Sequence, residues 1–148
     1  MAGSCSNANP EQGLLSLYYF QLKLWDKTMT KPSALIVEDD PTLNEIIALT
    51  LQEDFDIETC ADGNTAMELL GNIVPQIVVL DLNIPGISGR EILTHIRSNK
   101  RFEKTHVILA TADGRQAETL HNEADIILLK PVSPGQLREL ALRVSSMK

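Results

Sequence analysis

Short apolar runs alternate with helix-like segments along the chain from about residue 33 onward. Five runs have the length and apolar content typical of strands buried in a parallel sheet, at residues 34–37, 57–61, 77–80, 107–110 and 126–129. Between and after them, apolar residues recur at helical spacing over residues 41–50, 63–70, 89–98, 116–122 and 134–144. Pro41 and Pro134 suit the first turn of a helix, where a missing N–H costs nothing.

Strands and helices that alternate in this way predict an α/β fold with a parallel sheet covered on both faces. Right-handed crossovers leave few topologies for five such strands. We expect a flavodoxin-like, doubly wound sheet of strand order 2-1-3-4-5, with helices on both faces. The carboxyl ends of the first and third strands then form the switch point where such sheets bind ligands.

The chain divides into two parts, residues 1–32 and residues 33–148. We expect the first part to be an N-terminal extension that is partly disordered and carries an apolar aromatic segment at residues 14–25. Two interpretations of this extension stay open. In one it docks on the folded domain or pairs two copies into a homodimer; in the other Met29 is the natural start and the extension has no role.

Composition excludes several classes of function. The net charge is −7, and the 13 Lys and Arg residues are scattered, so we expect no direct binding to nucleic acid. Cys5 and Cys60 lack the spacing of a disulfide framework or a metal site, which favours a reducing cytoplasmic location. The apolar segment at residues 14–25 is too short to span a bilayer, so no membrane partner is expected.

Polar residues stand where four of the predicted strands end. Glu38, Asp39 and Asp40 follow the first strand and Asp81 the third, while Thr111 and Lys130 end the fourth and fifth. In the expected fold these side chains meet at one edge of the sheet. Two carboxylates about 4 Å apart repel by roughly 4 kcal/mol at an effective dielectric near 20, so the group needs a cation. Clustered carboxylate oxygens suit Mg²⁺.

An aspartate in such a site can act as a nucleophile toward phosphorus, because aspartyl phosphates are established covalent intermediates. Phosphoryl transfer depends mainly on positioning and on neutralising charge. Lys130 can pair with one phosphoryl oxygen and the Thr111 hydroxyl can donate to another. The sequence thus supplies every group that phosphate capture requires.

Four motifs in order resemble the signatures of bacterial two-component response-regulator receiver domains, including the stand-alone chemotaxis regulators. They are residues 36–40 (IVEDD), 80–89 (LDLNIPGISG), 110–112 (ATA) and 130–131 (KP), and the likeness extends over about residues 33–147. The resemblance implies that Asp81 is the phosphorylated residue. It implies a Mg²⁺ site made by Asp39, Asp40, Asp81 and the backbone carbonyl of Asn83.

The resemblance also assigns the remaining roles. Lys130 would contact the phosphate, Thr111 would be the switch hydroxyl, and Pro131 would follow a cis peptide. Asn83 and Asp113 occupy the positions that tune hydrolysis of the aspartyl phosphate.

Three departures from the family pattern affect signalling. Ile127 stands where the family usually has an aromatic switch residue; isoleucine has no ring to turn, and we expect it to be buried. The stretch from Thr111 to Ala124 is about one helical turn shorter than usual, which predicts a short or mobile fourth helix on the family's main output face. Ile84 and Ser88 replace the commoner Met and Asp without preventing phosphorylation.

The leading hypothesis is therefore a phosphoacceptor receiver domain with no attached output domain. It catalyses only its own phosphorylation and dephosphorylation and is not an enzyme in the usual sense. A histidine kinase or a histidine phosphotransfer protein would be the donor, and a separate effector protein the target. The alternative is a phosphorylation-independent pseudo-receiver that acts as a protein-interaction module. A phosphatase resembling the haloacid dehalogenases is disfavoured, because that family places its Asp-x-Asp motif after the first strand.

Overall fold

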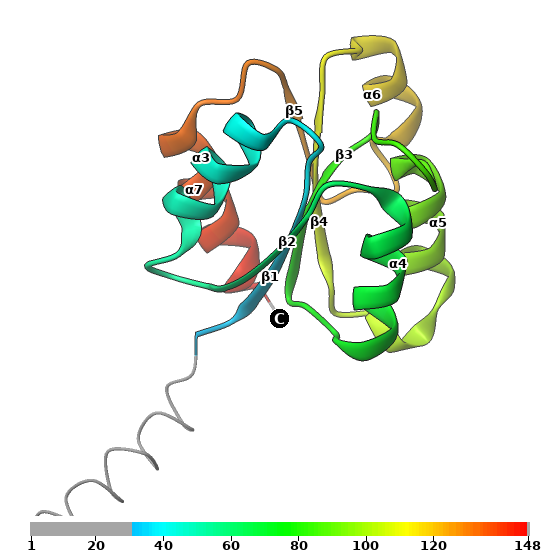
Figure 1. Cartoon of the computed structure of the whole chain (residues 1–148), viewed down its shortest axis with the longest axis horizontal. Helices are drawn as coiled ribbons and strands as arrows, with labels where there is room; N and C mark the ends of the chain where they lie inside the picture. Colours follow the sequence, from blue (N-terminus) through cyan, green and yellow to red (C-terminus); the bar gives the residue numbers. More distant parts are fainter. Residues whose placement is uncertain (1–30, 148) are drawn as a thin grey trace, which may run out of the picture. The chain divides into compact units, whose positions relative to one another are not determined.

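The computed structural model describes residues 31–147, which form a single parallel sheet with helices on both faces. In the labels of Figure 1, the elements run in the order β1 (Ser33–Val37), α3 (Pro41–Leu51), β2 (Asp56–Cys60), α4 (Gly63–Asn72), β3 (Ile77–Asp81), α5 (Gly89–Ser98), η1 (Lys100–Phe102), β4 (His106–Thr111), α6 (Gly114–Leu120), β5 (Ile126–Leu129) and α7 (Pro134–Ser145). The predicted aromatic extension lies outside the described residues, and the division of the chain at residue 32 stays a prediction.

The strand order is β2-β1-β3-β4-β5 and every pair is parallel, which confirms the predicted topology. The register pairs Val37 with Leu80, Asp81 with Ala110, and Thr111 with Leu129. The carboxyl ends of β1, β3, β4 and β5 therefore lie at one edge of the sheet. This is the edge at which sequence analysis placed the polar side chains.

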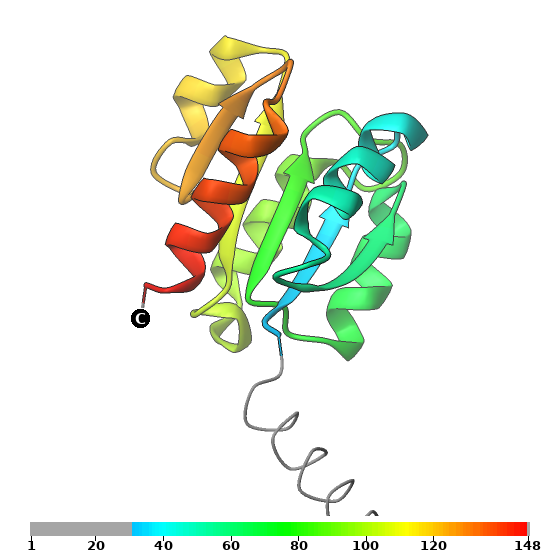
Figure 2. The ribbon, with the colours of Figure 1, turned by 90° about the vertical axis from the view of Figure 1, so that its left-hand side faces the viewer.

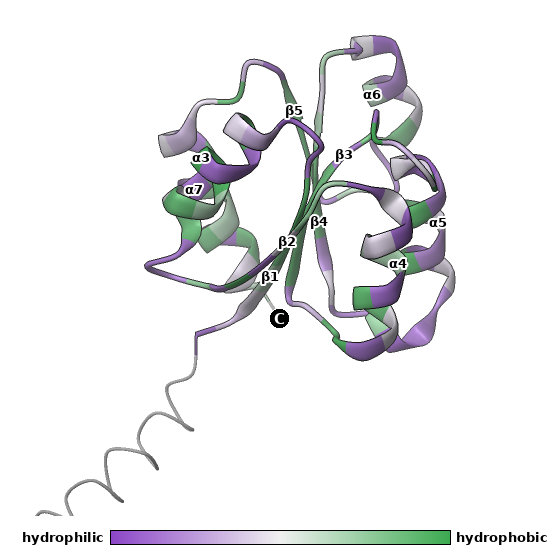
Figure 3. Ribbon diagram, in the orientation of Figure 1, coloured by the Kyte–Doolittle hydropathy of each residue, from purple (hydrophilic) through white to green (hydrophobic). Residues whose placement is uncertain are grey.

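Two apolar layers hold the helices against the sheet (Figure 1). Alternate residues of each strand point to opposite faces. Leu35 and Val78 belong to the layer that packs against α4, α5 and α6, whereas Ile36 and Val79 belong to the layer under α3 and α7. Figure 2 views the sheet from the side of α3 and α7, and Figure 3 shows the apolar sheet between helices whose outer surfaces are mostly polar.

Each α-helix within residues 31–147 begins at a capping side chain, as the sequence pattern suggests for several of them. The N-cap residues all have extended backbones, and the side chain of each accepts hydrogen bonds from N–H groups of the first turn: Asp40, Asp62, Ser88, Asp113 and Ser133. The prediction for residues 89–98 agrees with α5 at both ends. The fourth helix, α6, begins at Gly114, two residues before the predicted start at residue 116, because Asp113 is its N-cap.

Within residues 31–147, no helix combines the length and the hydropathy needed to cross a bilayer. Helix α6, which connects β4 to β5, has seven residues. The prediction that the fourth helix of the domain is short is therefore confirmed.

Candidate functional site

Asp81 lies at the carboxyl end of β3, with only 5% of its surface exposed. Its Oδ1 atom accepts a hydrogen bond from the backbone N–H of Asn83 at 3.0 Å, and its Oδ2 atom accepts one from Nζ of Lys130 at 3.0 Å. The side chain is thus held on both oxygens. A buried carboxylate with a fixed orientation at a sheet edge can present one oxygen to a ligand.

Three carboxyl groups meet at this edge. Glu38, Asp39 and Asp81 each offer an oxygen atom, and these oxygens all lie within 4.8 Å of one another. Glu38 and Asp81 are buried, whereas Asp39 is exposed. Among residues 31–147, no histidine or cysteine belongs to this group. Such a set of hard oxygen donors, open to solvent on one side, fits a small divalent cation better than zinc.

The structure corrects the predicted acidic pair. Oδ1 of Asp40 accepts hydrogen bonds from the N–H groups of Thr42 at 2.9 Å and Leu43 at 3.2 Å, so its carboxylate caps α3. Asp40 is not part of the cluster, and Glu38 takes the place predicted for it. The signal was present in the sequence: Pro41 at the first helical position marks the residue before it as the N-cap.

The ammonium group of Lys130 bridges the two buried carboxylates, Glu38 and Asp81. Its ammonium group donates to Oε1 of Glu38 at 2.7 Å and to Oδ2 of Asp81 at 3.0 Å. The residue follows the last position of β5, and its peptide bond to Pro131 is cis, as the resemblance implied. The backbone N–H of Lys130 also donates to the carbonyl of Thr111 at 2.9 Å, which ties the lysine to the end of β4.

The pKa values of the two buried acids, Glu38 and Asp81, are shifted in opposite directions. Burial raises the pKa of Glu38 to about 7, the adjacent Asp81 adds to this, and Lys130 acts against it. Burial also acts to raise the pKa of Asp81, but Glu38, the Asn83 N–H and Lys130 outweigh it and leave that pKa lowered. For Lys130, burial acts to lower the pKa, yet both carboxylates together keep it raised. Asp81 therefore stays ionised, as a nucleophilic carboxylate requires.

Thr111 ends β4 and is fully buried. Its Oγ1 atom accepts a hydrogen bond from the backbone N–H of Asp113 at 3.1 Å, so the hydroxyl proton is free to point elsewhere. The Asp113 side chain in turn caps α6 through the N–H of Arg115 at 2.9 Å. The predicted switch hydroxyl and the predicted tuning position are thus joined by one hydrogen bond at the start of α6.

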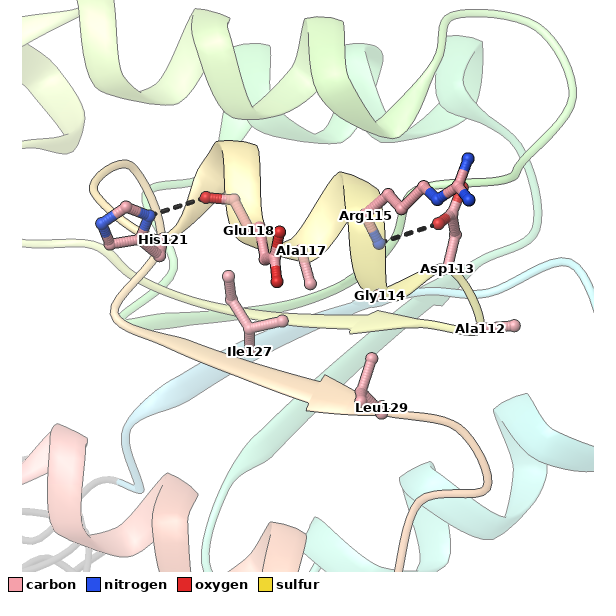
Figure 4. A pocket seen from close by; sticks show the side chains of 9 residues that line it. All are labelled: Ala112, Asp113, Gly114, Arg115, Ala117, Glu118, His121, Ile127 and Leu129. Carbon is pink, nitrogen blue, oxygen red and sulfur yellow. Dashed lines mark hydrogen bonds between the residues drawn. The ribbon is translucent and has the colours of Figure 1, made fainter.

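Ile127 is only half-buried, so the expectation that it would be buried was wrong. Figure 4 shows Ile127 and Leu129 of β5 pointing toward α6. These residues line an open hollow whose volume is about 880 Å³. Because α6 is short and carries Ala117 at its centre, its side chains cover the outer part of β5 only in part, and Ile127 stays partly exposed. The place of the family's switch aromatic is therefore partly empty.

Two glycines hold the loop after Asp81 through close backbone contacts that the sequence analysis did not predict. A Cβ atom on Gly89 would collide with the backbone carbonyl oxygen of Asp81, and one on Gly63 with that of Ile87. The N–H of Gly63 also donates to the carbonyl of Pro85 at 2.9 Å. Close backbone contacts of this kind require glycine and give no pattern in the sequence.

The family model for the response regulator receiver domain matches residues 34–142. The chain therefore belongs to the response-regulator receiver family, a component of two-component signal transduction systems. The acidic group at Glu38, Asp39 and Asp81 lies where such a domain would bind a metal ion.

Known relatives share the domain but are longer. The chain is 32% identical over 120 residues to the phosphate regulon transcriptional regulatory protein PhoB of Rhizobium meliloti, covering 78% of this chain and 52% of that protein. It is 31% identical over 121 residues to hybrid signal transduction histidine kinase D of Dictyostelium discoideum, covering 80% of this chain and 8% of that protein. The chain thus spans about half, or far less, of the relatives' length.

Among solved structures, the signal receiver domain of a putative LuxO repressor protein from Vibrio parahaemolyticus superposes with a TM-score of 0.71. The two chains are 28% identical, and the match covers 78% of this chain and 90% of that one. The flavodoxin-like fold is thus shared with known receiver domains.

Proposed function

We propose that this domain accepts a phosphoryl group on Asp81 in a Mg²⁺-dependent reaction. The observation that carries the proposal is the position of the Asp81 carboxylate, which belongs to the acidic group with Glu38 and Asp39 and also accepts a hydrogen bond from the Lys130 ammonium. A bound cation and a lysine beside one carboxylate can neutralise the charge of an incoming phosphoryl group.

The ligands proposed for Mg²⁺ are the carboxylates of Asp39 and Asp81, with Glu38 in place of Asp40, and the backbone carbonyl of Asn83. The oxygen-only donor set of the acidic group supports this ion. Bound there, Mg²⁺ would supply charge neutralisation between the carboxylate and the phosphoryl oxygens.

The donor is proposed to be the phosphohistidine of a histidine kinase or a histidine phosphotransfer protein, since histidine kinases occur among the relatives. One oxygen of the ionised Asp81 forms a bond to phosphorus, the phosphorus–nitrogen bond breaks, and the imidazole keeps the electron pair. Lys130 contacts one phosphoryl oxygen and the Thr111 hydroxyl donates to another. Asn83 and Asp113 tune the later hydrolysis by water.

A second candidate is the phosphorylation-independent interaction module. The half-buried Ile127 and the seven-residue α6 favour it, because both lie where a switch would relay the phosphate signal. The effector protein, a homodimer and a cytoplasmic location stay predictions.

The test is phosphorylation by a small-molecule donor such as acetyl phosphate, with and without Mg²⁺, followed by intact-mass spectrometry. We expect the wild-type protein to gain one phosphoryl group only when Mg²⁺ is present, and Asp81→Asn to gain none. Asp56→Asn, an exposed aspartate on β2, serves as the matched control and should behave as wild type. A folded wild-type protein that stays unmodified would favour the interaction module instead.

A further inference from the structure

Asn44 joins the ends of two strands to the first helix. It lies in the second turn of α3, and its Nδ2 group donates to the carbonyl of Glu38 at 2.9 Å and to the carbonyl of Cys60 at 3.0 Å. Glu38 directly follows β1, and Cys60 is the last residue of β2. One side-chain amide therefore uses both of its N–H groups on backbone carbonyls at the edge of the sheet where the acidic cluster lies.

The peptide between the two acidic residues is held on both sides. The N–H of Asp39 donates to Oε2 of Glu38 at 3.1 Å, and the carbonyl of Glu38 accepts from Asn44. The N–H of Glu38 donates to the carbonyl of Cys60 at 3.1 Å, the same oxygen that Asn44 contacts. Regular pairing of β1 with β2 ends at Val37 and Cys60, and at this end of the two strands the Asn44 amide adds a side-chain link to the backbone hydrogen bond between Glu38 and Cys60.

We propose that Asn44 is a positioning residue for the acidic cluster. By fixing the orientation of the Glu38–Asp39 peptide, it sets the directions in which both carboxylates leave the backbone toward Asp81. The expected effect on Mg²⁺ rests on the proposed function. Groups that orient metal ligands through hydrogen bonds commonly change metal affinity by about 10- to 100-fold when they are replaced.

The chemistry of the amide explains why asparagine suits this position. Aspartate has the same shape but would place one carboxylate oxygen, at the position of Nδ2, against both carbonyl oxygens, and leucine has no donor at all. Both substitutions leave the carbonyl of Glu38 without its side-chain donor. The aspartate variant also adds a negative charge beside the cluster, which by charge alone would strengthen cation binding.

The test compares Asn44→Asp and Asn44→Leu with the wild-type protein by isothermal titration of Mg²⁺. We expect the dissociation constant to rise about tenfold in both variants. The matched control is Asn72→Leu, because Nδ2 of Asn72 also donates to a backbone carbonyl, that of Glu68 at 3.0 Å, but at the far end of α4. We expect the control to stay within about twofold of wild type, since distant sites act independently.

Two results would overturn the proposal: tighter Mg²⁺ binding by Asn44→Asp, or affinities within about twofold of wild type in both Asn44 variants. If Asn44→Leu does not fold, the isosteric Asn44→Asp variant decides alone. Hydrogen exchange of the Asp39 amide in the metal-free protein gives a second readout, and we expect it to be faster in Asn44→Asp than in wild type. Unchanged exchange would contradict the positioning role, whereas a wild-type protein that binds no Mg²⁺ would contradict only the proposed function.

Discussion

Glu38 and Lys130 are 92 residues apart in the chain, yet Nζ of the lysine lies 2.7 Å from Oε1 of the glutamate. The same ammonium group contacts Asp81 at 3.0 Å, so one cation serves two buried carboxylates. Parallel strands that end at one edge of the sheet make this contact possible. The proposed phosphoacceptor is thus already paired with the lysine proposed to contact its phosphate.

Replacing this lysine should affect both stability and chemistry. We expect Lys130→Met to lower the free energy of unfolding by about 1–3 kcal/mol without Mg²⁺, because two buried acids lose their counterion. We also expect phosphorylation by acetyl phosphate to slow on the order of 100-fold, the usual cost of losing a donor to developing charge. Urea denaturation and timed mass spectrometry measure the two effects. Lys104→Met, at an exposed lysine, is the control, and equal behaviour of the two variants would contradict the assignment.

Mg²⁺ binding should release a proton from Glu38. Its pKa of about 7 means that the metal-free protein holds this proton in mildly acidic solution, whereas a cation binds the ionised carboxylate. We expect Mg²⁺ affinity to rise with pH up to about 7, and titrations in buffers of different ionisation enthalpy to show the release. Glu38→Gln should abolish the proton release. Release that persists in the variant would assign the proton to another group.

The same pKa predicts how the stability of the metal-free protein depends on pH. The folded-state pKa of Glu38 lies above the unfolded value of 4.5, so its favourable contribution is complete below 4.5 and is lost as the pH rises through about 7. Denaturation of the wild-type protein and of Glu38→Gln across this pH range measures the contribution of Glu38. We expect the free energy of unfolding of the variant to depend less steeply on pH.

Asp125 forms a separate ionic cluster at the opposite end of β4 from Thr111. Its Oδ2 atom accepts from Nη2 of Arg97 and from the backbone N–H of Val107, each at 2.7 Å. Burial acts to raise the pKa of Asp125, but the hydrogen bonds from Val107 and His106 and the charge of Arg97 outweigh it and lower the pKa. The stabilisation is therefore present above the unfolded pKa and lost as the pH falls through the folded one.

We accordingly expect Asp125→Asn to reduce the free energy of unfolding at neutral pH by about 1–2 kcal/mol. The difference from wild type should begin to shrink as the pH falls below the unfolded value of 3.8, and should close once the pH is below the lowered folded-state pKa of Asp125. Denaturation curves at neutral pH and in acid test this, with a substitution at the exposed Asp56, Asp56→Asn, as the control. A difference that persisted in acid would show that the charge of Asp125 does not explain the loss.

Gly89 should not tolerate a side chain. The Cβ atom of Gly89→Ala would meet the carbonyl oxygen of Asp81, so we expect a loss of about 1–3 kcal/mol in stability and slower phosphorylation as the loop shifts. Gly135→Ala is the matched control, because a Cβ there has no neighbour within 4 Å and lies on helix α7. We expect that variant to be as stable as wild type or more so. Equal stability of the two variants in thermal denaturation would contradict the contact.

The hollow beside Ile127 should accept an aromatic ring. We expect Ile127→Tyr to change the free energy of unfolding by less than about 1 kcal/mol, because the open space next to α6 can hold the larger side chain. Ile108→Tyr, at a fully buried position of β4, should cost more than about 3 kcal/mol through overpacking. Similar losses in both variants would show that the hollow does not admit a ring.

Local patterns were enough to predict most of the elements. Hydrophobic runs mark the strands and capping residues mark the helix starts, because both depend on neighbours in sequence. The acidic pair was harder, since three acidic residues, Glu38, Asp39 and Asp40, follow the first strand and only Pro41 distinguishes Asp40 from the others as a capping residue. The structure shows that Asp40 does cap α3, and it alone shows that Glu38 contacts Lys130.

By itself, the sequence determined the α/β class, the strand order and the polar residues at the strand ends, because periodicity and the handedness of crossovers restrict the alternatives. Tertiary structure alone decided which carboxylates share the lysine, how far Ile127 is covered and what Asn44 contacts. These depend on distances between residues far apart in the chain, and such distances exist only once the sheet has formed.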